Sequence, residues 1–127
     1  MTTITRTPAL LREAIKFDGF ATLPSGVLVA ALAGVLADPL GIPTGVLIGA
    51  GLFFIAWGAG VLYLGTRPVI DRRAAVAVGI VNVVCAVDGV AVALIADLTT
   101  FGTIALLALS AFVAGIGALQ LFAARRR

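Results

Sequence analysis

Residues 74–96, AAVAVGIVNVVCAVDGVAVALIA, decide the fold of this chain. Asn82 and Asp88 are the only strongly polar residues in this stretch. About 20 residues of helix are needed to cross the hydrocarbon core of a bilayer, which is about 30 Å thick. Because unpaired backbone groups are too costly in lipid, a continuous apolar stretch of this length predicts a membrane-spanning helix.

Three further apolar stretches accompany it, over about residues 20–36, 44–64 and 101–124. Turn-forming or polar residues separate the four stretches, at 38–43, 66–73 and 97–100. The sequence therefore predicts an all-α fold, a bundle of four transmembrane helices. We expect residues 1–127 to form a single integral membrane domain.

The composition supports this fold and excludes several kinds of chemistry. The chain is 61% hydrophobic and 12% charged, whereas soluble domains average about 45–50% and about 25%. It contains no His and one Cys, so imidazole metal sites, Ser-His or Cys-His catalysis and a disulfide-forming Cys pair are excluded. We expect no cofactor, no metal and no enzymatic activity.

The basic residues predict the orientation of the chain. They fall in three groups, before the first stretch, between the second and third, and after the fourth: Arg6, Arg12, Lys16, Arg67, Arg72, Arg73, Arg125, Arg126 and Arg127. Positively charged loops stay in the cytoplasm, so both termini are expected there, in a bacterial inner (cell) membrane. The same rule accounts for the net charge of +3, so no nucleic-acid partner is expected.

The segment before the first stretch has two interpretations. Residues 9–17 alternate apolar and charged side chains at helical spacing after Pro8, which is typical of a short interfacial helix on the membrane surface. Alternatively, the segment extends the first span. Ala31-Leu32-Ala33 also resembles a signal cleavage site, but the apolar run continues to Leu36, so we expect the helix to be retained.

Two patterns concern helix packing. At an offset of 59 residues, Ala37-Asp38 aligns with Ala96-Asp97, and Gly58-Ala59 with Gly117-Ala118. This alignment suggests duplication of a two-helix unit in parallel orientation. Small residues also recur at intervals of four in each stretch, which allows close helix contact either within the chain or in a dimer.

The third stretch contributes two of the four residues of a candidate intramembrane polar site, which is formed by Asn82, Asp88, Ser110 and Trp57. An acid within the membrane costs about 2.5–3.5 kcal/mol on insertion scales, so Asp88 is a candidate functional residue. The structural alternative is a hydrogen bond from Ser110, at similar depth, to Asp88. Trp57 lies at the depth of Asn82, where packing or a hydrogen bond to Asn82 accounts for it.

A second candidate group lies at the inner membrane boundary. Asp18 precedes the first stretch at the expected depth of Arg67, Arg72 and Arg73. An ion pair there would clamp the N-terminal segment to the middle loop. Because Asp18 lies outside the expected first span, that span has no acid in its interior. Small multidrug transporters carry an acid within their first helix, so this class is not expected.

The chain resembles a group of uncharacterised small four-helix integral membrane proteins of GC-rich bacteria. The resemblance rests on Asp18-Gly19, the Leu-Gly-Ile-Pro turn at residues 40–43, Thr66-Arg67-Pro68 and Asn82. It implies a four-span fold and topology and carries no activity with it. The Trp expected shortly after Asn82 is absent.

Two functions are consistent with these observations. The first is a non-catalytic membrane protein that acts through helix packing, as a homo-oligomer or as an accessory subunit of a membrane complex. Its partners would be membrane lipid and either further copies of itself or other membrane subunits. The second is a small transporter or an ion or proton channel that uses Asp88 and Asn82.

Overall fold

The computed structural model describes residues 8–125, and within them all regular structure is α-helical. The helices are α1 (Ala9–Ala31), α2 (Ala33–Leu40), α3 (Thr44–Thr66), α4 (Arg72–Ile95) and α5 (Thr100–Arg125). By length and composition, α1, α3, α4 and α5 are able to cross a membrane. The predicted all-α fold with four candidate spans is therefore confirmed.

Helices α3, α4 and α5 begin and end within two residues of the predicted stretches. Their ends coincide with recognisable stop and start signals. Gly41, with φ 73°, follows α2 in the left-handed conformation, and its N–H bonds to the carbonyls of Ala37 and Asp38. Asp71 caps the start of α4, where its carboxylate accepts from the Arg73 N–H at 2.9 Å.

Of the two interpretations of residues 9–17, extension of the first span is confirmed and the separate interfacial helix is wrong. The predicted bounds of the first span, residues 20–36, are wrong as well. Helix α1 starts directly after Pro8 and continues through Pro24 to Ala31 as one element. Leu11 and Ile15 are buried inside the bundle, so this segment packs against other helices and does not lie on a membrane surface. The first helix ends before Leu32, and residues 33–40 form the separate helix α2.

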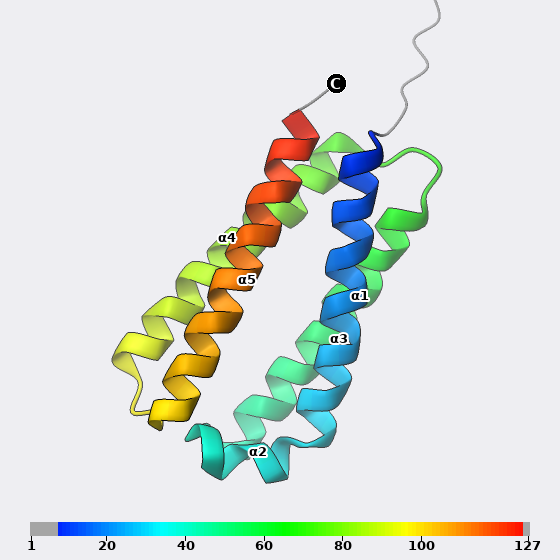
Figure 1. Cartoon of the computed structure of the whole chain (residues 1–127). Coiled ribbons are helices and arrows are strands. Elements are labelled where there is room, and N and C mark those ends of the chain that lie inside the picture. Colours follow the sequence, from blue (N-terminus) through cyan, green and yellow to red (C-terminus); the bar gives the residue numbers. More distant parts are fainter. Residues whose placement is uncertain (1–7, 126–127) are drawn as a thin grey trace, which may run out of the picture.

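The long helices form two hairpins that lie side by side, α1 with α3 and α4 with α5 (Figure 1). Backbone approach within each hairpin is far more extensive than between the hairpins, and the backbones of α3 and α4 scarcely meet. Glycines permit the close approach. A Cβ added to Gly51 would lie 2.6 Å from the Ala30 nitrogen, so only glycine fits there. In lipid, such backbone contact replaces the hydrophobic effect as the force between helices.

The two hairpins share a contact register, which supports the duplication suggested by the sequence. A Cβ on Gly58 would meet Leu23 of α1, and a Cβ on Gly117 would meet Asn82 of α4. Adding 59 to the first pair of numbers produces the second pair. The same offset relates a further two contacts, Gly51 with Ala30 and Ser110 with Gly89.

Helix α1 starts and helix α5 finishes at the same end of the bundle (Figure 1). We call this the terminal end. A core of buried side chains from all four long helices and the α3–α4 loop fills it: Leu11, Ile15, Val61, Ile70, Ala75, Val78, Ala123 and Ala124. Arg12 adds a clamp, because its guanidinium donates to the carbonyls of Gly65, Arg67 and Pro68 at 2.7, 2.7 and 2.9 Å.

The opposite end, which we call the turn end, is held by one polar connection. The Thr99 hydroxyl donates to the Pro39 carbonyl at 2.6 Å, and the Thr99 N–H bonds to the Leu40 carbonyl at 3.3 Å. Gly102 touches the Leu40 backbone so closely that a Cβ would collide with it. The end of α2 is thereby fastened to the α4–α5 link, while space remains between the hairpins beneath it.

Candidate functional site

A buried polar cluster joins the two hairpins, and its centre is the carboxylate of Asp18. Asp18 Oδ2 accepts from Asn82 Nδ2 and from Gln120 Nε2, both at 2.9 Å. Asn82 Nδ2 also donates to Gln120 Oε1 at 2.7 Å. Thr22, one turn along α1, donates its hydroxyl to Asp18 Oδ1 at 3.0 Å. The cluster therefore links α1, α4 and α5 through one carboxylate.

These side chains are shielded from the surroundings of the bundle. Asp18 and Asn82 are each 5% exposed, and Gln120 is 0% exposed. No buried side-chain N or O atom in residues 8–125 lacks a hydrogen-bond partner. A fully partnered network of this kind is worth more in an apolar interior than in water, so the cluster sets how the hairpins meet.

The expected ion pair at the inner boundary is not formed within the described residues. The partners of Asp18 are neutral, namely Thr22, Asn82 and Gln120. Asp18 lies nine residues inside α1, because that helix begins at Ala9 and not near Phe20. Its carboxylate is consequently drawn into the bundle interior, away from the loop that carries the arginines.

The arginines have other roles at the terminal end. Arg67 donates to the Tyr63 hydroxyl at 2.8 Å, with its guanidinium 5.6 Å from the centre of that ring. Arg72 and Arg73 form the first turn of α4. The expected clamp between the N-terminal segment and the middle loop does exist, but Arg12 makes it, through backbone carbonyls.

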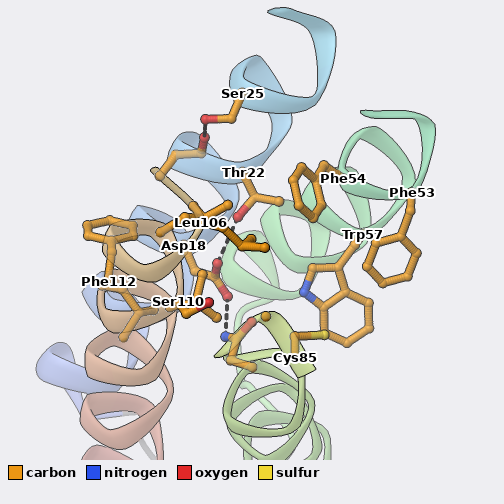
Figure 2. Close-up of a pocket in the computed structure, with 16 residues that line it drawn as sticks. Asp18, Thr22, Ser25, Phe53, Phe54, Trp57, Cys85, Leu106, Ser110 and Phe112 are labelled. Atoms are coloured by element: carbon orange, nitrogen blue, oxygen red, sulfur yellow. Dashed lines mark hydrogen bonds between the residues drawn. The ribbon is translucent and has the colours of Figure 1, made fainter. Parts of the chain in front are cut away.

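An inner cavity of about 200 Å³ lies between the hairpins, with Asp18 and Asn82 on its wall. Figure 2 shows Asp18 and Thr22 on one side and the aromatic rings of α3 on another, and Ser110 lines the same cavity. The wall is mainly apolar. Because the core of the terminal end lies beyond the cluster, Asp18 marks the floor of this cavity.

An outer cavity of about 690 Å³ continues from the inner one toward the turn end. The two share wall residues from three helices: Phe54, Gly89, Leu106 and Leu109. On the outer walls Val46 is 58% exposed and Val92 46% exposed. The outer cavity therefore opens between α3 and α4, where the hairpins are least packed, and it adjoins the inner cavity. We call the two cavities together the inter-hairpin path.

Three of the four residues of the predicted polar site line the inner cavity, namely Asn82, Ser110 and Trp57. Asp88 does not join them. It is exposed and lies on the wall of the outer cavity. The expected hydrogen bond from Ser110 to Asp88 is absent from the described bonds, because Ser110 sits against Gly89, the neighbour of Asp88 on the adjacent face of α4.

Trp57 makes no hydrogen bond to Asn82 within the described residues, although both line the inner cavity. Its ring stacks on Phe53, with centroids 6.1 Å apart and an interplanar angle of 12°. The indole nitrogen is turned toward the cavity (Figure 2). Trp57 therefore belongs to the aromatic wall of the cavity.

Sequence reasoning missed Gln120 and gave Asp18 the wrong role. Gln120 lies inside the predicted fourth stretch. An amide side chain within a membrane span is costly unless it is hydrogen-bonded, so this residue could have been recognised as part of a buried polar site. Asp18 and Thr22 lie four residues apart, on one face of a helix. That spacing was visible in the sequence and indicated a polar patch within α1.

The corrected first span also removes one exclusion. Small multidrug transporters were not expected because the predicted first span had no acid in its interior. Helix α1 does carry a buried acid, Asp18, between Ala9 and Ala31.

The described residues contain no group of three His, Cys, Asp or Glu that would hold a metal ion.

Comparison with protein-family models, with curated proteins and with solved structures finds no match for this chain. What the site does must therefore be argued from its own geometry. The geometry consists of a buried carboxylate with neutral partners, at the floor of a mainly apolar cavity that opens between two hairpins.

Proposed function

We propose that this protein is a non-enzymatic, multi-pass protein of the bacterial cell membrane that binds a cation at Asp18 and carries it through the inter-hairpin path. The single observation that carries this proposal is the missing counter-charge. Asp18 is buried among neutral donors, and no basic residue lines either cavity in the described chain. Ionisable groups inside membranes normally pair with an opposite charge or mark an ion or substrate pathway.

The distribution of charge along the path supports the same function. The charged residues that line the two cavities are all acidic: Asp18, Asp88 and Asp97. The described basic residues gather at the other end of the bundle, on the first half of α1, the α3–α4 loop, the start of α4 and the end of α5. A path lined by one sign of charge raises the local concentration of the opposite ion.

The proposed orientation follows the positive-inside rule, with both termini in the cytoplasm. The outer cavity then faces the extracytoplasmic half of the membrane, and the packed terminal end closes the path toward the cytoplasm. Carrying a cation across requires the terminal-end core to separate. The weak packing between hairpins supports such a rocking motion, by analogy with transporters built from two parallel repeats.

Asp18→Asn is expected to reduce cation flux at least tenfold in proteoliposomes, because the amide removes the only negative charge at the cavity floor while keeping its shape. Flux of Na⁺, K⁺, H⁺ and small organic ammonium ions would be measured under an imposed membrane potential. Asp38→Asn is the matched control, since Asp38 is exposed and lines neither cavity. Flux of every cation unchanged by Asp18→Asn, or no flux in the wild type, would contradict the proposal.

Asp88→Asn separates this proposal from the second function suggested by the sequence, a transporter or channel that uses Asp88 and Asn82. Asp88 lies on the open outer wall, where charge assists entry but does not bind the ion. We therefore expect most of the flux to remain in this variant. A loss as large as that of Asp18→Asn would place the site at Asp88 instead.

A second candidate function, helix packing with another copy or subunit, is favoured by one observation. Gly45 and Gly49 form a Gly-x-x-x-Gly pair on α3, and a Cβ at either position would meet nothing within 4 Å. The pair is thus not used inside the chain, and this spacing is typical of membrane helix dimers. Native mass spectrometry in a gentle detergent tests it, and a strict monomer without a partner contradicts it.

A further inference from the structure

The walls of the inner cavity carry information about the kind of cation, beyond its charge. Phe53, Phe54 and Trp57 of α3 and Phe112 of α5 line the cavity that contains Asp18. Figure 2 shows these rings on both sides of the carboxylate. Aromatic faces attract cations, and sites that bind organic ammonium groups are typically built from them. Aromatic rings also accommodate the apolar substituents of such a group.

The Asp18 carboxylate has acceptor capacity that the protein does not use, which points to a hydrogen-bond donor on the ligand. A carboxylate offers about four acceptor positions. Oδ2 of Asp18 already accepts two bonds and Oδ1 accepts one, from Thr22. One position therefore remains on Oδ1.

Ser110 provides an independent, unpartnered group in the same cavity. It is only 3% exposed, and within residues 8–125 its hydroxyl has no hydrogen-bond partner. Since no buried side-chain polar atom of the described chain lacks a partner, the hydroxyl must open on the cavity that Ser110 lines. Ser110 lies against Gly89, about 10 Å along α4 from the level of Asn82, so its hydroxyl marks a second polar position on the turn-end side of Asp18.

The shape of the path fits a ligand with one charged end. The inner cavity of about 200 Å³ has room for a small ammonium group, and the outer cavity of about 690 Å³ is mainly apolar. The outer volume lies within the range of about 300–1,000 Å³ that is usual for small-molecule sites. An inorganic ion would leave most of this apolar space without a partner.

We propose that the ligand is an amphipathic organic ammonium ion. Its N–H⁺ group donates to Asp18 Oδ1, and its apolar part lies along Trp57 and Phe54 toward the outer cavity. This inference rests on the proposed cation function and names the substrate class of that same site.

Trp57 is the only tryptophan of the chain, so its fluorescence reports directly on the cavity. The full chain in lipid nanodiscs would be titrated with 2-phenylethylammonium, with its neutral analogue 2-phenylethanol, and with NaCl and KCl. We expect a saturable change in Trp57 emission with the ammonium ion alone. Asp18→Asn should weaken binding at least tenfold, whereas Asp38→Asn should leave it unchanged.

Phe54→Leu keeps the experiment decisive if Asp18→Asn fails to fold, because it removes no hydrogen bond of the described structure. We expect it to weaken ammonium binding several-fold while the helix content stays that of the wild type, because Phe54 lines both cavities and its ring faces the apolar part of the ligand. Equal affinity for 2-phenylethanol, or unchanged affinity in Phe54→Leu, overturns the assignment of the ammonium. A response to Na⁺ or K⁺ alone overturns it too, while the proposed cation function survives. No response to any cation removes both.

Discussion

Replacing Asn82 by leucine is expected to lower the free energy of unfolding by about 2 kcal/mol. The Asn82 amide donates to both Asp18 and Gln120, so its removal leaves a buried carboxylate and a buried amide oxygen each short of one partner. Such unpaired groups cost more than the bond itself contributes. Unfolding in mixed detergent micelles, followed by circular dichroism, measures the change.

A triple apolar variant distinguishes a structural cluster from a functional one. Replacing Asp18, Asn82 and Gln120 together by leucine removes every polar group that would be left unpaired, apart from the partly exposed Thr22 hydroxyl. Apolar replacement of whole buried ionic networks is often neutral or stabilising, so we expect stability close to that of the wild type and no ammonium binding. A triple variant less stable than Asn82→Leu would show that the cluster exists chiefly to hold the fold.

Gly51→Leu is expected to destabilise the protein by about 3 kcal/mol, because overpacking of a tight contact forces the backbone to shift. Any Cβ at Gly51 meets the Ala30 backbone at 2.6 Å, and backbone cannot rotate aside as a long side chain can. We expect α1 and α3 to separate along this contact. Unfolding in mixed micelles would show a lower midpoint and an altered near-ultraviolet spectrum.

Gly49→Leu is the matched control, two residues away on the same helix. Nothing lies within 4 Å of a Cβ at this position, and leucine is favoured over glycine in a helix by up to about 1 kcal/mol. We expect unchanged or higher stability. A loss equal to that of Gly51→Leu would contradict the described helix contact, and a loss of oligomers alone would support the second candidate function.

The extent of α3, α4 and α5 was predictable because their ends coincide with residues that cannot continue an apolar helix. The prediction was wrong for α1. Arg12, Glu13 and Lys16 lower the hydropathy of its first half, which therefore looked like a surface segment. Tertiary contacts reverse that interpretation, since Leu11 and Ile15 lie in the core of the terminal end and Arg12 reaches the carbonyls of the middle loop.

The candidate site was predictable only in part for a similar reason. Asn82 lies between Gly79 and Ala86 on a face of small residues in α4, and it is 5% exposed. The hydrogen bonds expected from Trp57 to Asn82 and from Ser110 to Asp88 are not among those of the described residues, and Asp88 lies on the wall of the outer cavity. The partners that Asn82 does have, Asp18 and Gln120, come from two other helices.

The sequence by itself determined that this chain has four long apolar helices and where three of them begin and end. The number and the ends of these helices follow from the free energy of placing apolar and polar side chains in lipid. Only the tertiary structure decided that Asp18, Asn82 and Gln120 meet, and that a cavity remains above them. Helical phase orients a side chain relative to its own helix, but contacts such as Gly51 on Ala30 and Gly117 on Asn82 set which helices approach and in what register.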